Sequence, residues 1–436
     1  MVTMTDADEM TETSAGKRYF QLATVVVAAG AIYPLIYLRQ NFEVSILESF
    51  GITIGQLSQC YSLIGVIFVL TYVPSGWLAD RVSPRLLVVF SLTMTGLLGL
   101  WFSSMPSFGA LQIIFAGWGI ATGLTFWSSH IKVVTLLAKH NEQGRFFGIL
   151  DGGRGLVEAA LATIAVAWFA YGIGTRRIAT DLALQQVIYM YVTFLLVLAP
   201  IVYFALDDNR PDDSSHKKAN INFLADLKVI LGKEEVWLSA FCILAGYQLF
   251  WATYSFSAYM QQNFGMTAVT VGSITVAKLW MRPIGAATAG FAGDYLDREK
   301  VLATLLVAAA AALAGIAVLP TSASIIALLG VVLLVGILTY AVRGIFWATL
   351  DSCNIPARIK GLAIGAISLI GYSPDIYLPL INAALLEKYP GQTGYSIYFT
   401  GIALVGLLGA AAAWRLKTIV ARQAHGAGAG PDISVA

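Results

Sequence analysis

The sequence predicts an all-α membrane protein with twelve transmembrane helices in two six-helix bundles. Three observations support this fold class: the composition, the number of long apolar runs and an internal repeat near half of the chain length. Of the 436 residues, 58% are hydrophobic and only 12% are charged, and the mean hydropathy is +0.74. Soluble domains average about 25% charged residues. The composition therefore excludes a soluble enzyme, and a net charge of +2 argues against nucleic-acid binding.

Twelve apolar runs approach or exceed the ~20 residues that a helix needs to cross a bilayer. The expected spans are 19–48, 55–79, 84–104, 109–138, 144–171, 183–206, 236–262, 268–293, 299–319, 322–350, 359–386 and 393–418. We expect the first run to be retained, because it is too long for a signal peptide. The predicted organisation is an N-terminal tail (1–18), a first bundle (19–206), a linker (207–235), a second bundle (236–418) and a C-terminal tail (419–436).

Lysine and arginine are distributed unevenly among the predicted loops. Outside the spans, the loops on one side hold only Arg176, Arg177 and Lys388, and the remaining loops and tails hold most of the 27 basic residues. Basic loops stay in the cytoplasm. The sequence thus predicts a multi-pass inner (plasma) membrane protein with both termini in the cytoplasm.

A short polar motif occurs twice. The first copy, in the loop after the second span, contains Gly76, Asp80, Arg81 and Arg85. The second copy contains Gly290, Asp294 and Arg298. Gly290 follows Gly76 by 214 residues, and Asp294 follows Asp80 by the same 214 residues. A repeat at half of the chain length is typical of transporters built from two similar halves.

The first copy resembles the signature loop of the major facilitator superfamily, Gly-x-x-x-Asp-Arg-x-x-x-Arg, and every fixed position is present. The resemblance covers essentially the whole chain. It implies the major facilitator fold, transport by alternating access, and a gating role for both copies of the motif. In particular, it implies that Asp80 latches the outward-open state. We also expect the glycine at the helix end to let another helix approach closely.

Charged side chains inside the predicted spans carry the main functional inference. The cations are Arg39, Lys132, Arg154, Lys278, Arg282 and Arg343, and the acids are Asp151, Glu158, Asp375 and, near a span end, Glu43. Each cation costs ~2.5–3.5 kcal/mol at a helix centre unless it faces a partner or a wet cavity. The excess of cations over acids favours an anionic substrate.

Several of these charges have more than one possible partner. Asp151, Arg154 and Glu158 share one helix face, so they can satisfy each other or pair with Lys132. For Arg154 we favour pairing within this group over a ligand role.

Lys278 and Arg282 are four residues apart and repel unless Asp375 or a substrate lies between them. Pro283 is expected to weaken the helix there.

Asp375 lies between Pro374 and Pro379, which should break their helix and make this carboxylate a candidate for proton coupling. Arg343 shares a helix face with Tyr340 and Trp347, an arrangement that suits a sugar or carboxylate ligand. The aromatic residues of span 236–262 are interpreted equally well as packing residues or as a cavity wall.

A closer resemblance concerns the segment from Tyr37 to Phe42, which is similar to the first helix of the organophosphate and organic-anion branch. That resemblance implies that Arg39 binds substrate, but the branch's second arginine is replaced here by Phe250, so Lys132, Arg282 or Arg343 would serve instead. The residues around Arg154 and Asp375 also resemble uncharacterised bacterial permeases found near sugar-acid genes.

We therefore predict a monomeric secondary transporter for a small organic anion, such as a sugar acid, sugar phosphate, sulfonate or carboxylate. It is driven by protons or by exchange for another anion, and it needs no cofactor or metal. The predicted substrate-binding residues are Arg39, Lys132, Arg282, Arg343, Tyr37 and Trp347, and the coupling candidates are Asp375, Asp151 and Glu158. The alternatives are a nitrate/nitrite-type porter and a membrane sensor of a sugar phosphate with a transporter fold. No arrangement of a nucleophile and a base indicates an enzyme.

Overall fold

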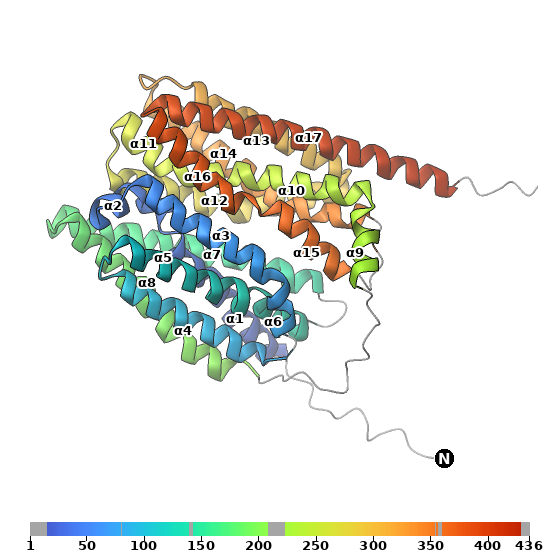
Figure 1. Cartoon of the computed structure of the whole chain (residues 1–436), viewed down its shortest axis with the longest axis horizontal. Helices are drawn as coiled ribbons and strands as arrows, with labels where there is room; N and C mark the ends of the chain where they lie inside the picture. The colour runs from blue at the N-terminus through green and yellow to red at the C-terminus, as the bar shows by residue number, and fades with distance from the viewer. Residues whose placement is uncertain are drawn as a thin grey trace, which may run out of the picture.

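The computed structural model describes residues 15–79, 81–138, 143–207, 223–353, 355 and 360–428. Its regular elements are all helices, and they form two bundles that lie side by side (Figure 1). The blue-to-green helices of the first half make one bundle, and the yellow-to-red helices of the second half make the other. The predicted fold class is confirmed.

The first bundle contains six spans, three of them made of more than one helical piece. Its elements are α1 (Ala15–Ile36), α2 (Arg39–Phe50), α3 (Ile54–Ala79), α4 (Pro84–Phe102), α5 (Phe108–Gly119), η1 (Ile120–Phe126), α6 (Trp127–Leu137), α7 (Gln143–Ala170), η2 (Tyr171–Thr175) and α8 (Thr180–Ala205). A short amphipathic helix, α9 (Phe223–Leu231), precedes the second bundle.

The second bundle repeats this plan. Its elements are α10 (Glu234–Ala252), η3 (Thr253–Ser255), α11 (Phe256–Phe264), α12 (Ala268–Tyr295), α13 (Arg298–Val318), α14 (Ile325–Ile345), η4 (Phe346–Cys353), α15 (Lys360–Gly371), α16 (Pro374–Lys388) and α17 (Gln392–Gly428). Eleven spans among the described residues are long and apolar enough to cross a membrane. The twelfth is α12, whose mean hydropathy is lowered by Lys278 and Arg282.

Breaks within the spans place irregular backbone near the centre of the molecule. Tyr37 and Leu38 form a turn between α1 and α2, and η3 is a 3₁₀ turn between α10 and α11. As expected, the span around Asp375 breaks before Pro374, which cannot donate the backbone hydrogen bond of a continuing helix. Pro283, in contrast, lies within the continuous helix α12, so α12 does not break there.

The described start of α1, the end of α17 and α9 lie at one end of the molecule, which we call the terminal end; the opposite end is the distal end (Figure 1). At the distal end the bundles contact each other directly. Ser257 of α11 donates a hydrogen bond to the Asn41 carbonyl of α2 over 3.3 Å. Further toward the centre, Trp280 of α12 donates to Thr163 of α7 over 3.1 Å.

The backbones of the two bundles approach each other closely at Gly65 of α3. A methyl group added to this glycine would lie 2.6 Å from the backbone carbonyl carbon of Asp375. Contacts this short do not occur between real Cβ atoms and backbone, so only glycine permits α3 to cross α16 here.

Candidate binding cavity

A cavity of about 90 Å³ lies between the bundles, beside the helix breaks. Its lining residues are Tyr33, Tyr37, Phe68, Tyr72, Thr122, Gly123, Trp127, Arg154, Glu158, Tyr247, Phe250, Tyr254, Arg282, Arg343, Tyr372 and Asp375. Both bundles contribute, and five of these residues are ionisable acids or arginines. A larger groove on the outer face of α7 and α8, which includes Trp168 and Phe194, is lined by no charged side chain. Charge and position between the bundles identify the smaller cavity as the candidate site.

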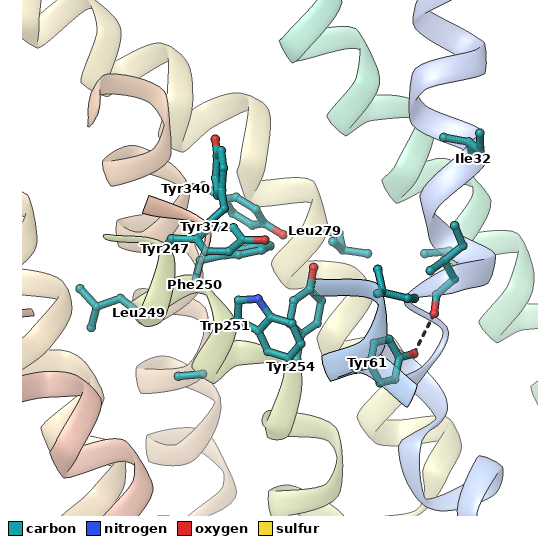
Figure 2. Packing of buried hydrophobic residues seen from close by; sticks show 14 of the residues in the cluster. Ile32, Tyr61, Tyr247, Leu249, Phe250, Trp251, Tyr254, Leu279, Tyr340 and Tyr372 are labelled. Carbon is teal, nitrogen blue, oxygen red and sulfur yellow. Dashed lines mark hydrogen bonds between the residues drawn. The ribbon is translucent and has the colours of Figure 1, made fainter. Parts of the chain in front are cut away.

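Aromatic rings make up most of the cavity wall. Tyr247, Phe250 and Tyr254 of α10 and η3 gather with Tyr340 and Tyr372 in the packed centre of the second bundle (Figure 2). The aromatic residues of span 236–262 are therefore partly a cavity wall.

Across the bundle interface, the rings of Tyr37 and Tyr254 stack with centroids 5.4 Å apart and an interplanar angle of 9°. Both residues belong to helix breaks. The predicted site residue Tyr37 thus lies in the cavity.

Asp375 lies at the start of α16, only 3% exposed. Its Oδ1 accepts a hydrogen bond from the Tyr247 hydroxyl over 2.8 Å and another from the Trp251 indole N–H. Of the two groups expected between Lys278 and Arg282, Asp375 or a substrate, Asp375 pairs with neither cation: its hydrogen-bond donors are aromatic residues of α10.

Arg282 of α12 instead bridges to the first bundle. Its Nη1 donates to Glu158 Oε2 over 2.6 Å and its Nη2 to Asp151 Oδ1 over 3.3 Å. Both acids belong to α7, so three of the predicted residues meet across the interface. The expectation that Asp151 and Glu158 satisfy Arg154 or pair with Lys132 was wrong, because the opposite bundle supplies their partner.

Arg154 and Arg343 line the same cavity from α7 and α14. Among the described residues, neither forms an ion pair, and each guanidinium lies over an aromatic ring. Arg154 is 5.0 Å from the centroid of Tyr33, and Arg343 is 4.1 Å from that of Phe250. The aromatic neighbours of Arg343 come from α10, not from Tyr340 and Trp347 of its own segment. Trp347 does not line the cavity; its indole donates to the Tyr372 hydroxyl over 2.9 Å.

Three other cations lie away from the cavity. Arg39 is 1% exposed, donates to Glu43 over 2.8 Å and lies over the Tyr61 ring. Lys132 donates to the Ala79 carbonyl over 2.8 Å, near the end of α3. Buried Lys278 donates to the Thr253 hydroxyl over 2.9 Å. The structure therefore does not bring Arg39 or Lys132 together with the other predicted binding residues.

The repeated motif lies at the terminal ends of α3 and α12. Apart from the adjoining residues, no described atom lies within 4 Å of the point where a side chain would begin at Gly76 or Gly290, so the close helix approach expected at the motif glycine is not seen among the described residues. Arg81 lies 4.1 Å from the centroid of Trp77, and Arg85 donates to the Leu206 carbonyl over 3.3 Å. Arg298 begins α13. Asp80 lies outside the described residues, and the side chain of Asp294 is not described.

The sequence profile of the Major Facilitator Superfamily matches residues 19–379. The chain belongs to this superfamily. Among curated relatives, the inner membrane protein YqcE of Escherichia coli is 27% identical over 90% of this chain and 93% of its own length. A D-galactonate transporter of E. coli is 23% identical over 90% of this chain and 94% of its own length. A nitrite extrusion protein of Bacillus subtilis is 25% identical over 90% of this chain and 92% of its own length.

Solved structures show the same fold. A bacterial homologue of the human lysosomal transporter Spinster superposes with a TM-score of 0.71 at 13% identity, covering 94% of this chain and 98% of the other. The nucleoside transporter NupG gives a TM-score of 0.69 at 12% identity, covering 92% and 99%. The chain is thus a membrane transporter by family.

Sequence reasoning did not assign a binding role to Arg154 or to the tyrosines Tyr33 and Tyr72. One signal was available for Tyr33: it precedes Tyr37 by one helical turn and therefore shares its face. The sequence does not indicate that Arg154 lacks an ion pair with Asp151 or Glu158. The partner of both acids is Arg282, which lies more than 120 residues away in the chain.

Proposed function

We propose that the protein is a secondary active transporter that moves a small organic anion across the inner membrane by alternating access. The observation that carries this proposal is the placement of Arg154 and Arg343. They face one cavity from opposite bundles, and each lies over an aromatic ring with no ion pair to a described residue.

The energetics favour a ligand between them. Arg154 and Arg343 are partly buried. A guanidinium gains only ~0.5–2 kcal/mol from an aromatic ring, less than the ~2.5–3.5 kcal/mol that an arginine costs at a helix centre. A carboxylate or similar anion would supply charge-assisted hydrogen bonds to both arginines. Because the arginines belong to different bundles, such a ligand contacts both halves and biases their relative position.

The relatives support this class of substrate. One relative is a D-galactonate transporter and another is a nitrite extrusion protein, so anions are handled by two proteins that align with most of this chain. The inner membrane protein YqcE supports the location.

The orientation follows from the basic residues of the predicted loops, which place the terminal end in the cytoplasm. With that orientation, the hydrogen bond from Ser257 to the Asn41 carbonyl joins the bundles at the end that faces the outside, and Gly65 packs against Asp375 at the cavity itself.

The charge count bears on energy coupling. The three arginines near the cavity, Arg154, Arg282 and Arg343, are matched by three acids, Asp151, Glu158 and Asp375. An incoming monoanion leaves this group with one excess negative charge. A proton on Asp375, or the departure of another anion, restores the balance, so proton symport and exchange both fit the site.

Thermal unfolding of the purified protein tests the proposal. The ligands are sugar acids, sugar phosphates, sulfonates, dicarboxylates and nitrate, and a ligand at 100 times its Kd stabilises by ~2.7 kcal/mol. We expect an organic anion to stabilise the wild type, with the effect lost in Arg154→Gln and Arg343→Gln. Arg176→Gln, an exposed arginine outside the cavity, is the matched control and should keep the effect.

Two outcomes contradict the proposal. Stabilisation by nitrate alone would favour the nitrate/nitrite porter. Binding of an organic anion without uptake into proteoliposomes would favour the sensor.

A further inference from the structure

Six tyrosines line the cavity, and the hydroxyls of two of them are engaged within the protein. Tyr247 donates to Asp375, and Tyr372 accepts from Trp347. The other four form no hydrogen bond with any described residue: Tyr33, Tyr37, Tyr72 and Tyr254. Their hydroxyl oxygens are not among the sealed, unpaired polar atoms of the described protein. They therefore remain accessible from the cavity.

This arrangement points to a ligand with hydroxyl groups of its own. A tyrosine hydroxyl that is removed from bulk water normally finds a hydrogen-bond partner. Four such hydroxyls around one small space, two from α1 and its break, one from α3 and one from η3, provide donors and acceptors in several directions. A ligand that enters this space must offer these hydroxyls the hydrogen bonds that water would otherwise make.

Asp375 adds an acceptor to the same wall. Both of its described donors bind Oδ1, so Oδ2 keeps its capacity to accept from a ligand hydroxyl. The stacked rings of Tyr37 and Tyr254 add an apolar surface that suits the C–H groups of a polyol. Cation, hydroxyls and apolar rings thus occur together in one cavity.

We propose that the substrate is a polyhydroxylated monocarboxylate of the sugar-acid class. Its carboxylate binds Arg154 and Arg343, and its hydroxyls bind Tyr33, Tyr37, Tyr72, Tyr254 and Asp375. This inference rests on the proposed function and adds that hydroxyl groups, not charge alone, determine specificity.

Three matched sets of six-carbon compounds separate charge from hydroxyls. The aldonates D-gluconate, D-mannonate and D-galactonate carry both features, hexanoate carries only the charge, and the alditols glucitol, mannitol and galactitol carry only the hydroxyls. We expect at least one aldonate to shift the unfolding temperature of the full-length protein at concentrations where hexanoate and the alditols do not.

Each other outcome has a distinct meaning. If hexanoate raises the unfolding temperature as much as the aldonates do, the inference that hydroxyls determine specificity is wrong, but the anion site is still supported. Equal stabilisation by an alditol would overturn the anion site itself. Binding of a different anion, with no aldonate bound, would overturn the sugar-acid inference alone.

Tyrosine-to-phenylalanine variants test the residues. Tyr33→Phe, Tyr37→Phe, Tyr72→Phe and Tyr254→Phe each keep the ring and remove one hydroxyl, so we expect a two- to about tenfold loss of aldonate affinity at two or more of these positions. Tyr295→Phe, at an exposed tyrosine of α12, is the matched control and should bind as the wild type does. Wild-type affinity in all four cavity variants would overturn the proposal.

Discussion

Arg282 of α12 and Glu158 of α7 form a hydrogen-bonded ion pair across the two bundles, with Nη1 and Oε2 2.6 Å apart. Asp151, two turns earlier on α7, is the second acceptor of the same guanidinium at 3.3 Å. The backbone of α7 accommodates the contact through Gly155, where an added methyl group would lie 2.8 Å from Cδ of Arg282. Alternating access moves the bundles relative to each other, so this pair must break or exchange partners during the proposed cycle.

Removing one partner of this pair should destabilise the protein. Arg282 is 9% and Glu158 20% exposed, and the loss of one member of a buried pair typically costs about 3–5 kcal/mol. Because Asp151 and solvent compensate in part, we expect Glu158→Gln to lower the free energy of unfolding by roughly 1–3 kcal/mol, measured by thermal or denaturant unfolding in detergent.

A charge reversal tests whether the interaction itself matters. The double variant Glu158→Arg with Arg282→Glu should recover part of the stability lost in each single reversal, as a double-mutant cycle measures. If the double variant loses as much free energy of unfolding as the two single variants lose together, the two side chains do not interact in the purified protein.

Gly65 should be required for the close packing of α3 on α16. Alanine places a methyl group 2.6 Å from the Asp375 backbone, and the backbone cannot move aside as a flexible side chain can. We expect Gly65→Ala to slow transport at least tenfold and to reduce disulfide formation between cysteines introduced at Asn41 and Ser257, in a background without the three native cysteines. Gly109→Ala is the control, because an added methyl group there meets nothing within 4 Å, and it should transport and cross-link as the wild type does. Unchanged cross-linking in Gly65→Ala would show that α3 and α16 separate in the working protein.

The overall fold was predictable because a bilayer imposes a simple rule on sequence. Each span needs about 20 apolar residues and an internally satisfied backbone, so the apolar runs are sufficient to locate the spans. The break before Pro374 was predictable for a similarly local reason, since proline cannot continue a helical hydrogen-bond ladder.

The partners of the buried charges were predictable only where they are local. Arg39 and Glu43 pair within one helical turn, a spacing that the sequence displays directly. Arg282 and Glu158 are 124 residues apart, and their contact depends on how α7 and α12 pack. The role that we propose for Arg154 could be inferred only once the structure showed that Arg282 occupies its acidic neighbours.

Asp80 should control gating without being needed for folding. The motif occurs twice, at the terminal ends of α3 and α12, which we assign to the cytoplasm. We expect Asp80→Asn to insert and fold normally but to slow proteoliposome uptake severely, because the outward-open state loses its latch. Asp181→Asn, at an exposed acid in the first turn of α8, is the control. Wild-type uptake by Asp80→Asn would exclude a latch at this position.

Asp375 should couple transport to protons. Carrying a free anion into a cell with a negative interior costs about 2.3 kcal/mol per charge per 100 mV, so uphill uptake needs a co-transported proton or an exchanged anion. Asp375 is the buried carboxylate of the cavity that Tyr247 and Trp251 hold in place without an ion pair to a described residue, and asparagine mimics its neutral form. We expect an inward proton gradient to drive uptake by the wild type into empty proteoliposomes. Asp375→Asn should lose that response and retain counterflow exchange, because exchange needs no titratable group. Uptake by the wild type that requires internal anion and ignores the proton gradient would show that the protein is an exchanger.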